Sequence, residues 1–517
     1  MMDLVICPLP RMSLFYPPLA PALLKSCAEE NGFNVKIVDC LIKFYQAFYK
    51  KEHWEKIDHW LVIPDMKDDE TLHVLRQELS KWAQEILSYN PRWIGLSVFS
   101  YESHKIATLL VYEIRRLNFD VKIVFGGMGV TGDANDYGKD LLDTGLIDAM
   151  LQGDGEESLI ALLKGEPITG KHLIKKLDAI PFANWEDYDL DQYRIFKNQN
   201  AQLSLQSNLI DKSDMFQGYD NVWYRNDSIL TLPITGSKGC VRQCTFCDVP
   251  SHWPTFYTRS AKHMFEEIVY QYHLHKPERF HFTDSLINGN MKVFREFCKL
   301  LAEWKEEKNA EFTFTGQFIC RSWKGETDED YALMRKAGMR LLEVGIETGS
   351  EAVRFHMGKK FTNEDVFKLF ERCGRNNIKV LLLMIVGYPY ETKDNHLETM
   401  QFIKDCMQYR SVIEGVVLGH TLTVDDDALL AKDPNLVFTK LDNGKTDPLL
   451  WTNKVNPELT LYERLCRRVE LLELTQSLGL LAPTNNQELL YLHAKWKELG
   501  KYEGTNEFKD PFKDIFK

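Results

Sequence analysis

The sequence has 517 residues, a formal net charge of −12 and 27% charged residues. A chain of this length exceeds a single hydrophobic core, so roughly two to four domains are expected. The acidic balance argues against bulk nucleic acid or an anionic membrane surface as a partner, and no run approaches the ~20 apolar residues of a membrane span. Eleven cysteines without a secretion signal indicate a reducing cytoplasm.

The first 160 residues alternate short apolar runs with helical patterns. Strands are predicted at 3–7, 35–38, 93–98, 121–125 and 148–151, and helices at 22–30, 103–117 and after 152. Buried strands that alternate with helices are typical of a parallel, doubly wound, Rossmann-like α/β sheet. Such sheets bind their ligands at the carboxyl ends of the strands.

Residues 161–228 are mixed and polar, with a packed linker expected at 180–193 and an insertion or lid at 198–227. A second alternation follows. Its strands are predicted at 229–235, 279–283, 311–317, 341–346, 379–386 and 415–418, and its helices at 260–275, 290–308, 328–337, 363–376 and 393–406. Six successive β/α units predict a partial barrel, with its chemistry at the strand carboxyl ends. Residues 424–517 are predicted to form a loop and then helices, most clearly at 459–478.

Three cysteines lie close together in SKGCVRQCTFCDVP, directly after the first predicted barrel strand. Cys240, Cys244 and Cys247 follow the pattern C-x3-C-x2-C. Thiolates bind zinc, other soft metals and iron–sulfur clusters. A structural zinc site needs a fourth ligand, for which His252 is the nearest candidate. A redox pair of Cys244 and Cys247 leaves Cys240 without a role. The spacing therefore favours a four-iron cluster with one iron open.

These residues resemble the signature of radical S-adenosylmethionine (SAM) enzymes, in which an aromatic residue, here Phe246, precedes the last cysteine. LLEVGIETGSEAVRFHMGKKFT and IVGYPYET resemble further blocks of the branch that carries an N-terminal cobalamin-binding domain. YPPLAPALLKSCAEENGFNVKIVDC, IGLSVFS, VFGGMGVTG and IDAMLQGDGEESL resemble that domain and occur in the expected order. The resemblance implies a cobalamin-binding-like domain at 1–160, a linker and insertion at 161–228, a (β/α)6 partial barrel at 229–423 and a helical C-terminal region at 424–517.

The resemblance also implies roles for single residues. The three cysteines are expected to bind a [4Fe-4S] cluster whose open iron is chelated by SAM, and SAM is then cleaved reductively to a 5′-deoxyadenosyl radical. Many relatives have a Gly-Gly-Glu motif for the SAM amino group after the second barrel strand. This chain has Asp284 there instead. The other SAM-site candidates are Phe246, Gln317, Glu347 for the ribose hydroxyls, Lys359 (or its neighbour Lys360) for the methionine carboxylate, and Gly387 near the adenine.

The cobalamin assignment depends on the predicted architecture of the first domain. The D-x-H-x-x-G motif that places a histidine under cobalt is absent from the sequence, as in much of this branch. Ser97, Ser100, Gly126 and Gly127 are the candidate residues at the ligand edge of the first sheet. The alternative is a domain that keeps the fold and binds no cofactor.

The function expected from this resemblance is cobalamin-dependent methyl transfer to an unactivated carbon. One alternative is radical SAM rearrangement, cyclisation or methylthiolation without methylcobalamin. A second is a non-catalytic corrinoid- or metal-binding protein. The expected partners are a small-molecule or peptide substrate and an electron donor such as flavodoxin or ferredoxin, with no nucleic acid and no membrane.

Overall fold

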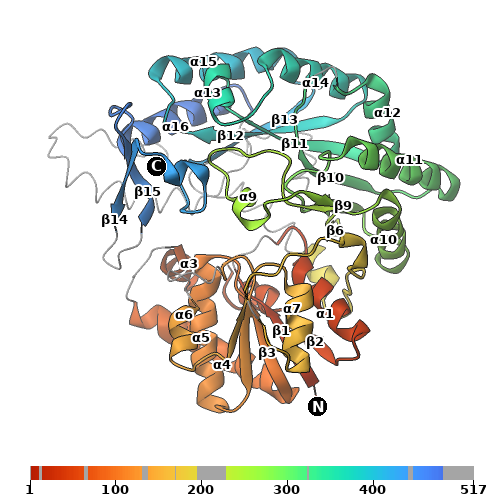
Figure 1. The fold of residues 1–517 in the computed structure, drawn as a ribbon, viewed down its shortest axis with the longest axis vertical. Helices are drawn as coiled ribbons and strands as arrows, with labels where there is room; N and C mark the ends of the chain where they lie inside the picture. The colour runs from red at the N-terminus through yellow and green to blue at the C-terminus, as the bar shows by residue number, and fades with distance from the viewer. Residues whose placement is uncertain are drawn as a thin grey trace. The chain divides into compact units, whose positions relative to one another are not determined.

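The computed structural model describes residues 2–10, 14–49, 51–62, 68–130, 138–168, 170–194, 229–322, 325–440 and 446–480. The predicted insertion at 198–227 and the tail beyond residue 480 lie outside these ranges. The chain divides into two compact units, Met1–Lys197 and Asn198–Lys517, which are coloured red to yellow and green to blue in Figure 1.

The first unit contains a five-stranded parallel sheet with the strand order β2-β1-β3-β4-β5. Its strands are β1 (Met2–Pro8), β2 (Val35–Ile37), β3 (Pro91–Ser97), β4 (Lys122–Gly126) and β5 (Ala149–Leu151). The order reverses direction at β1, as in doubly wound sheets. The predicted α/β fold class is therefore confirmed, and each strand lies within two residues of its predicted position.

Seven α-helices in the described part of the first unit accompany this sheet: α1 (Leu19–Glu30), α2 (Cys40–Phe48), α3 (Trp54–Val62), α4 (Asp69–Ser88), α5 (Tyr101–Leu117), α6 (Lys139–Asp143) and α7 (Gly155–Lys164). Helices α1 and α7 pack together, as do α4 and α5. Apolar strand residues such as Ile94 and Phe125 share one core with Leu79 of α4 and Leu110 of α5. Helices α2 to α4 fill the long connection between β2 and β3, for which the sequence analysis named no elements.

The segment after α7 packs onto the first unit, as expected for residues 180–193. Its Asp187 carboxylate accepts hydrogen bonds from Lys25 Nζ at 2.7 Å, Lys36 Nζ at 2.6 Å and the Ile37 backbone N–H at 2.8 Å. Burial raises the pKa of Asp187, but the two lysines outweigh this effect and the pKa is lowered. The Tyr193 hydroxyl donates to Asp39 at 2.7 Å. These bonds fix residues 177–194, the linker segment, against α1 and β2.

The second unit contains a six-stranded, wholly parallel sheet with the order β13-β12-β11-β10-β9-β6. Its strands are β6 (Thr231–Ile234), β9 (Arg279–Phe282), β10 (Thr313–Phe318), β11 (Met339–Glu347), β12 (Lys379–Val386) and β13 (Ile413–Thr421). Strands β6 and β13 form the two edges. The predicted partial (β/α)6 barrel is confirmed.

Helices cover one face of this sheet (Figure 1). They are α10 (Ala261–His275), α11 (Met291–Lys308), α12 (Asp328–Ala337), α14 (Asn363–Arg375) and α15 (Lys393–Asp405), with the short α9 (Val249–His252) and α13 (Glu351–His356) in loops. Phe282 of β9 and Phe314 of β10 contact Phe297 of α11, with ring centroids 5.7 and 5.8 Å apart. Because side chains alternate along a strand, the residues next to these phenylalanines face the opposite side, here called the inner face.

The chain after β13 differs in part from the sequence prediction. Where a loop was expected, the structure has the turn η5 (Leu429–Lys432) and an antiparallel hairpin, β14 (Leu436–Lys440) with β15 (Thr446–Asn453). Trp451 of β15 is buried in the core of this region. Helix α16 (Leu461–Ser477) confirms the helix predicted at 459–478. No helix in the described ranges is both long and apolar enough to cross a membrane.

Candidate active site

The three clustered cysteines follow β6 in a loop at the carboxyl end of the barrel strands. The loop, residues 239–256, is closed by the short antiparallel pair β7 (Ser237–Lys238) and β8 (Tyr257–Thr258). Cys244 is buried, whereas Cys240 and Cys247 are partly exposed, and all three are free thiols. The loop therefore presents these cysteines at the edge of the sheet where β/α barrels carry out their chemistry.

Thr245, between two of the cysteines, fixes the loop to three other segments. Its backbone N–H donates to the Met357 carbonyl after α13 at 3.1 Å, and its carbonyl accepts from the Leu430 N–H at 2.8 Å. Its hydroxyl is hydrogen-bonded to the Tyr388 hydroxyl at 2.7 Å, and that phenol oxygen is 2.8 Å from His356 Nδ1. The loop is thus held in place before any metal binds.

Burial favours the neutral form of two of the thiols, so a metal would have to displace their protons on binding. Burial raises the pKa of Cys244, and Lys359 opposes that effect. Burial raises the pKa of Cys247 to about 12. No three His, Cys, Asp or Glu side chains within the described ranges converge to hold one metal ion. A four-iron cluster is bound by thiolates at separate irons, so its ligands need not meet at one point. The donor set of this loop fits such a cluster.

Glu347 and Lys359 form an ion pair beside the cysteine loop. Glu347 ends β11 with a left-handed backbone, φ +67°. Lys359 Nζ lies 2.7 Å from Glu347 Oε1 and donates to the Gly345 carbonyl at 2.9 Å. Burial lowers the pKa of Lys359, but Glu347 and Cys244 outweigh it and the pKa is raised. Lys359 Nζ also lies 6.0 Å from the centroid of the Phe246 ring. The structure therefore brings together Cys244, Phe246, Glu347 and Lys359.

Asp284 is buried just after the end of β9. Both of its carboxylate oxygens accept from the Gly236 backbone N–H, at 2.9 and 3.0 Å, and one also accepts from the Ser237 hydroxyl. Burial raises the pKa of Asp284 to about 6. These bonds fix the entry to the cysteine loop. A contact between Asp284 and SAM stays a prediction, and it would share a carboxylate that already has these partners.

The loop after β12 is held by helix α16. Gly387 has φ +78°, and a Cβ there would lie 2.6 Å from Cγ of Arg464. The buried Arg464 guanidinium donates to the carbonyls of Leu422 at 3.2 Å and Leu449 at 2.9 Å. Gly387 therefore lets the loop pass against the stem of a buried arginine on α16.

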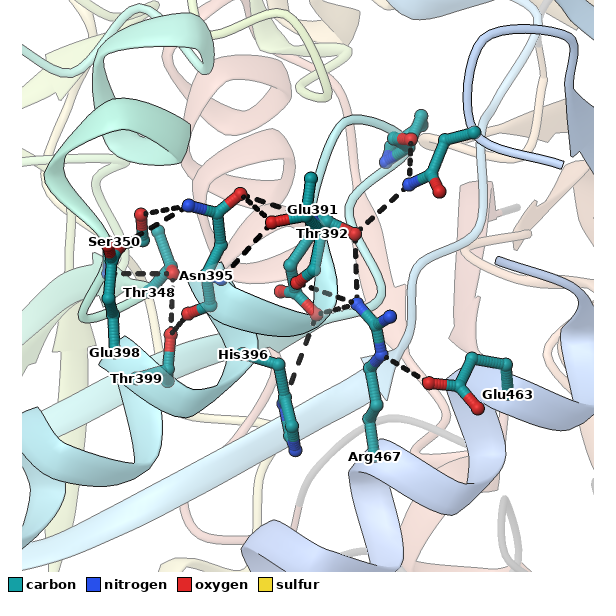
Figure 2. A network of polar contacts seen from close by, with 12 residues as sticks. Thr348, Ser350, Glu391, Thr392, Asn395, His396, Glu398, Thr399, Glu463 and Arg467 are labelled. Carbon is teal, nitrogen blue, oxygen red and sulfur yellow. Dashed lines mark hydrogen bonds and ion pairs between the residues drawn. The ribbon is translucent and has the colours of Figure 1, made fainter. Parts of the chain in front are cut away.

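Figure 2 shows the polar network that joins the same loop to α16. Arg467 Nη1 donates to Glu391 Oε1 at 2.8 Å and to the Glu391 carbonyl at 2.9 Å, and Nε donates to Glu463 at 2.9 Å. His396 Nε2 is 2.8 Å from Glu470 Oε2. Burial raises the pKa of Glu391 to about 7, although Arg467 lowers it. The loop that carries Gly387 is therefore anchored by a buried ion pair.

Gln317, the remaining SAM-site candidate, is on β10. Its side chain is exposed, and its backbone carbonyl accepts from the Ile287 N–H at 2.8 Å. Its register partner on β11 is Glu343. Gln317 therefore lies on the inner face, and its contact with SAM or substrate stays a prediction.

The four cobalamin candidates lie at the carboxyl edge of the first unit's sheet. Ser97 is level with Gly126 in the β3–β4 register. The Ser100 side chain caps α5 by accepting from the Ser103 N–H at 3.4 Å. Gly127 has φ +113°, and a Cβ there would lie 2.5 Å from the Val98 carbonyl oxygen. Ser100 and Gly127 thus each have a structural role that does not depend on a cofactor.

Two large apolar side chains are exposed near that edge. Phe99 is 49% exposed and Met128 is 37% exposed. They flank Ser97 and Gly126 in the sequence and follow the ends of β3 and β4. An apolar rim beside a glycine-containing strand end suits a flat, largely apolar macrocycle, so these residues fit a corrin.

Two further residues, which were not expected from the sequence, shape the barrel site. A Cβ on Gly345 would lie 2.8 Å from Lys359 Nζ, so the Glu347–Lys359 pair requires glycine at this position. Tyr388 lies within IVGYPYET and connects Thr245 to His356. The sequence G-I-E before Thr348 could have indicated the role of Gly345, whereas no local sequence pattern distinguishes Tyr388.

The chain resembles known proteins in both sequence and structure. Residues 234–403 match the Radical SAM superfamily. The anaerobic magnesium-protoporphyrin IX monomethyl ester cyclase of Synechocystis sp. is 23% identical over 319 residues, which are 60% of this chain and 58% of the cyclase. The cytidylyl-2-hydroxyethylphosphonate methyltransferase of Streptomyces wedmorensis is 22% identical over 421 residues, covering 72% of this chain and 69% of that protein.

Two solved structures share the fold over most of the chain. The methyltransferase TsrM from Kitasatospora setae, with cobalamin and a [4Fe-4S] cluster bound, is 19% identical and has a TM-score of 0.54, covering 86% of this chain and 81% of TsrM. The cobalamin-dependent SAM radical enzyme OxsB, with aqua-cobalamin bound, is 12% identical and has a TM-score of 0.63, covering 100% of this chain and 78% of OxsB. The predicted resemblance is confirmed for the fold.

Proposed function

We propose, from the premise that this chain is a radical SAM enzyme through residues 234–403, that it catalyses cobalamin-dependent methyl transfer to an unactivated carbon. Cys240, Cys244 and Cys247 would hold a [4Fe-4S] cluster, and Ser97, Gly126 and the rim of Phe99 and Met128 would hold cobalamin. When bound, the cluster supplies the electron that cleaves SAM to a 5′-deoxyadenosyl radical, and cobalamin supplies the methyl group.

The arrangement around Glu347 carries the SAM part of this proposal. The carboxylate at the end of β11 suits two ribose hydroxyl donors, and the ammonium of Lys359, 2.7 Å away, suits the methionine carboxylate. Both side chains are largely buried, at 11% and 15% exposure, so each charge is already paired and oriented before SAM arrives. Such preorganisation would hold SAM beside the cysteine loop.

The cobalamin part is supported by the fold and by the residues at the sheet edge. The first unit has the doubly wound order whose ligands lie at strand carboxyl ends, and the TsrM and OxsB structures contain cobalamin. Ring closure without methyl transfer is the second candidate, because a relative that aligns with 60% of the chain is named a cyclase.

The substrate, we infer, is a small molecule or a peptide. A small redox protein such as flavodoxin or ferredoxin is the proposed electron donor.

The decisive experiment reconstitutes the anaerobically purified chain with iron, sulfide and hydroxocobalamin, and then measures iron, corrin and SAM cleavage after desalting. About four irons and one corrin per chain are expected. Cys244→Ala should lose the iron and the cleavage. The matched control is Cys298→Ala, because Cys298 is a buried thiol on α11 remote in sequence from the cysteine loop.

Each outcome distinguishes a different part of the proposal. Retained SAM cleavage in Cys244→Ala would overturn the cluster assignment. Iron and SAM cleavage without retained corrin would leave radical SAM chemistry and favour the ring-closing alternative.

A further inference from the structure

Three polar residues meet on the inner face of the barrel sheet, outside the site described above. They are His281 of β9, Thr315 of β10 and Glu343 of β11, here called the inner-face trio. His281 and Thr315 are level in the strand register, and His281 Nδ1 is hydrogen-bonded to Thr315 Oγ1 at 3.0 Å. Glu343 Oε1 lies 3.7 Å from the same His281 nitrogen. Three neighbouring strands thus direct polar groups to one place.

On the side of β12 the surroundings of Glu343 are apolar. Leu341 and Leu381 form a small buried cluster with Leu383 and Val417, and Leu381 is the register partner of Glu343 on β12. Only 14% of the Glu343 side chain is exposed. Burial raises its pKa to about 7. A carboxyl group in such a place is unfavourable unless it is hydrogen-bonded or its charge is paired.

One Glu343 oxygen lacks a hydrogen bond. Oε1 is buried and has no hydrogen-bond partner within the described ranges. The 3.7 Å separation from His281 Nδ1 exceeds a hydrogen bond, and that nitrogen already contacts Thr315. Within the trio, Glu343 Oε1 is therefore a buried acceptor without a donor, and a bound molecule could supply that donor.

The trio lies on the same sheet as the proposed SAM site. Glu343 precedes Glu347 by four residues on β11, which corresponds to about 13 Å along a strand. Gln317, the register partner of Glu343, has an exposed side chain, so the inner face is open to solvent at this level. A small molecule anchored at Glu343 would therefore extend toward the carboxyl edge, where Glu347 and Lys359 lie.

We propose that the inner-face trio is the anchoring subsite for the substrate, and that it selects a substrate carrying a protonated amine. This inference depends on the proposed radical SAM function and adds the substrate class to it. An ammonium donates a hydrogen bond to Glu343 Oε1 and also neutralises the buried carboxylate, whereas a hydroxyl offers only the hydrogen bond. Thr315 orients His281, and His281 borders the site on the side of β9.

The test compares ligands that differ only in the amine. Reconstituted holoenzyme is titrated with benzylamine and tryptamine, and with their neutral counterparts benzyl alcohol and tryptophol, by ligand-detected NMR. At least one amine is expected to bind about 10-fold more tightly than its alcohol, the scale of a charge-assisted hydrogen bond. Glu343→Gln keeps the shape of the side chain and should reduce that preference to less than about 2-fold.

Glu303→Gln is the matched control, because Glu303 is an exposed carboxylate on α11, with 64% of its side chain accessible, and should leave the preference unchanged. Equal binding of amines and alcohols to the wild type would overturn the proposal, as would a preference that survives Glu343→Gln. Iron content and SAM cleavage are measured on the same preparations. If the wild type holds no iron and does not cleave SAM, the radical SAM function itself is refuted. If it cleaves SAM normally but shows no preference for amines, only the proposed subsite is refuted.

Discussion

The buried pair between Arg467 and Glu391 gives the most direct test of how the C-terminal helix supports the barrel. Arg467→Met removes the guanidinium and leaves the Glu391 carboxylate, only 3% exposed, without its counter-charge. Its remaining ionic neighbour is His396, whose Nδ1 lies 3.9 Å from Glu391 Oε1. Breaking a buried pair from one side costs about 3–5 kcal/mol.

Removing both charges should cost much less. The double variant Arg467→Met/Glu391→Met replaces the pair by apolar side chains, which is often close to neutral. The difference between the double variant and the sum of the single variants gives the coupling free energy. We expect a coupling of about 2–4 kcal/mol, because the two side chains share one 2.8 Å bond in a buried setting.

Hydrogen exchange of α16 and of residues 387–392 measures this effect locally, without requiring the whole chain to unfold in one step. In Arg467→Met these amides should exchange more than 100-fold faster than in the wild type, and in the double variant they should recover most of their protection. Unchanged exchange in Arg467→Met would refute the anchoring role. Equally fast exchange in the single and double variants would show that packing rather than charge holds the loop.

Three further changes test the barrel site. Gly387→Ala should lower the thermal midpoint of unfolding, because the new Cβ would lie 2.6 Å from the side chain of Arg464. Gly165→Ala is the control, since Gly165 has φ +76° and no neighbouring atom within 4 Å of the added Cβ. This control should show only the backbone penalty of about 1 kcal/mol. Glu347→Ala should weaken SAM binding by ~10- to 100-fold at unchanged iron content, as measured by equilibrium dialysis. Because burial raises the pKa of Asp284 from 3.8 to about 6, the folded chain binds more protons than the unfolded chain between these values. Its stabilising contribution is therefore complete below pH 3.8 and is lost as the pH rises through about 6. Relative to Asp284→Asn, the wild type should lose up to ~3 kcal/mol between about pH 4 and pH 7 in unfolding measurements.

The contrary results are specific to each change. Equal midpoints for the two glycine variants would mean that Arg464 moves aside without penalty. An unchanged SAM affinity in Glu347→Ala would remove Glu347 from the SAM site. A pH-independent difference between the wild type and Asp284→Asn would mean that the carboxylate stays charged across this range.

The barrel and the first sheet were predictable because their signals are local. Strand β12 is the run Lys379–Val386, whose apolar residues are typical of a buried parallel strand. The hairpin β14–β15 was not predictable in the same way. Asp447 and Pro448 interrupt the alternation of β15, and proline within a run argues against a strand. Its alternation is visible only once Leu449 and Trp451 are seen buried on one side.

The same difference between local and long-range signals applies to the residues of the site. The cysteine spacing and the G-I-E segment are contiguous, so sequence alone located them. The Arg467–Glu391 pair joins residues 76 positions apart, and both are common surface types, so no local pattern distinguishes them. The inner-face trio is harder still to predict, since His281, Thr315 and Glu343 come from three strands, and only the pairing of these strands brings them together.

The ion pairs of Asp187 with Lys25 and Lys36 have a consequence for the evolution of such chains. The linker segment covers α1 and β2 of the unit from which it emerges, so the first unit includes its own lid over that surface. A gene fusion or exchange near residue 195 would transfer this unit together with the segment that covers α1 and β2. Catalytic barrels and cofactor modules could then be recombined across this junction, with new chemistry arising by exchange of whole modules as well as by point substitution.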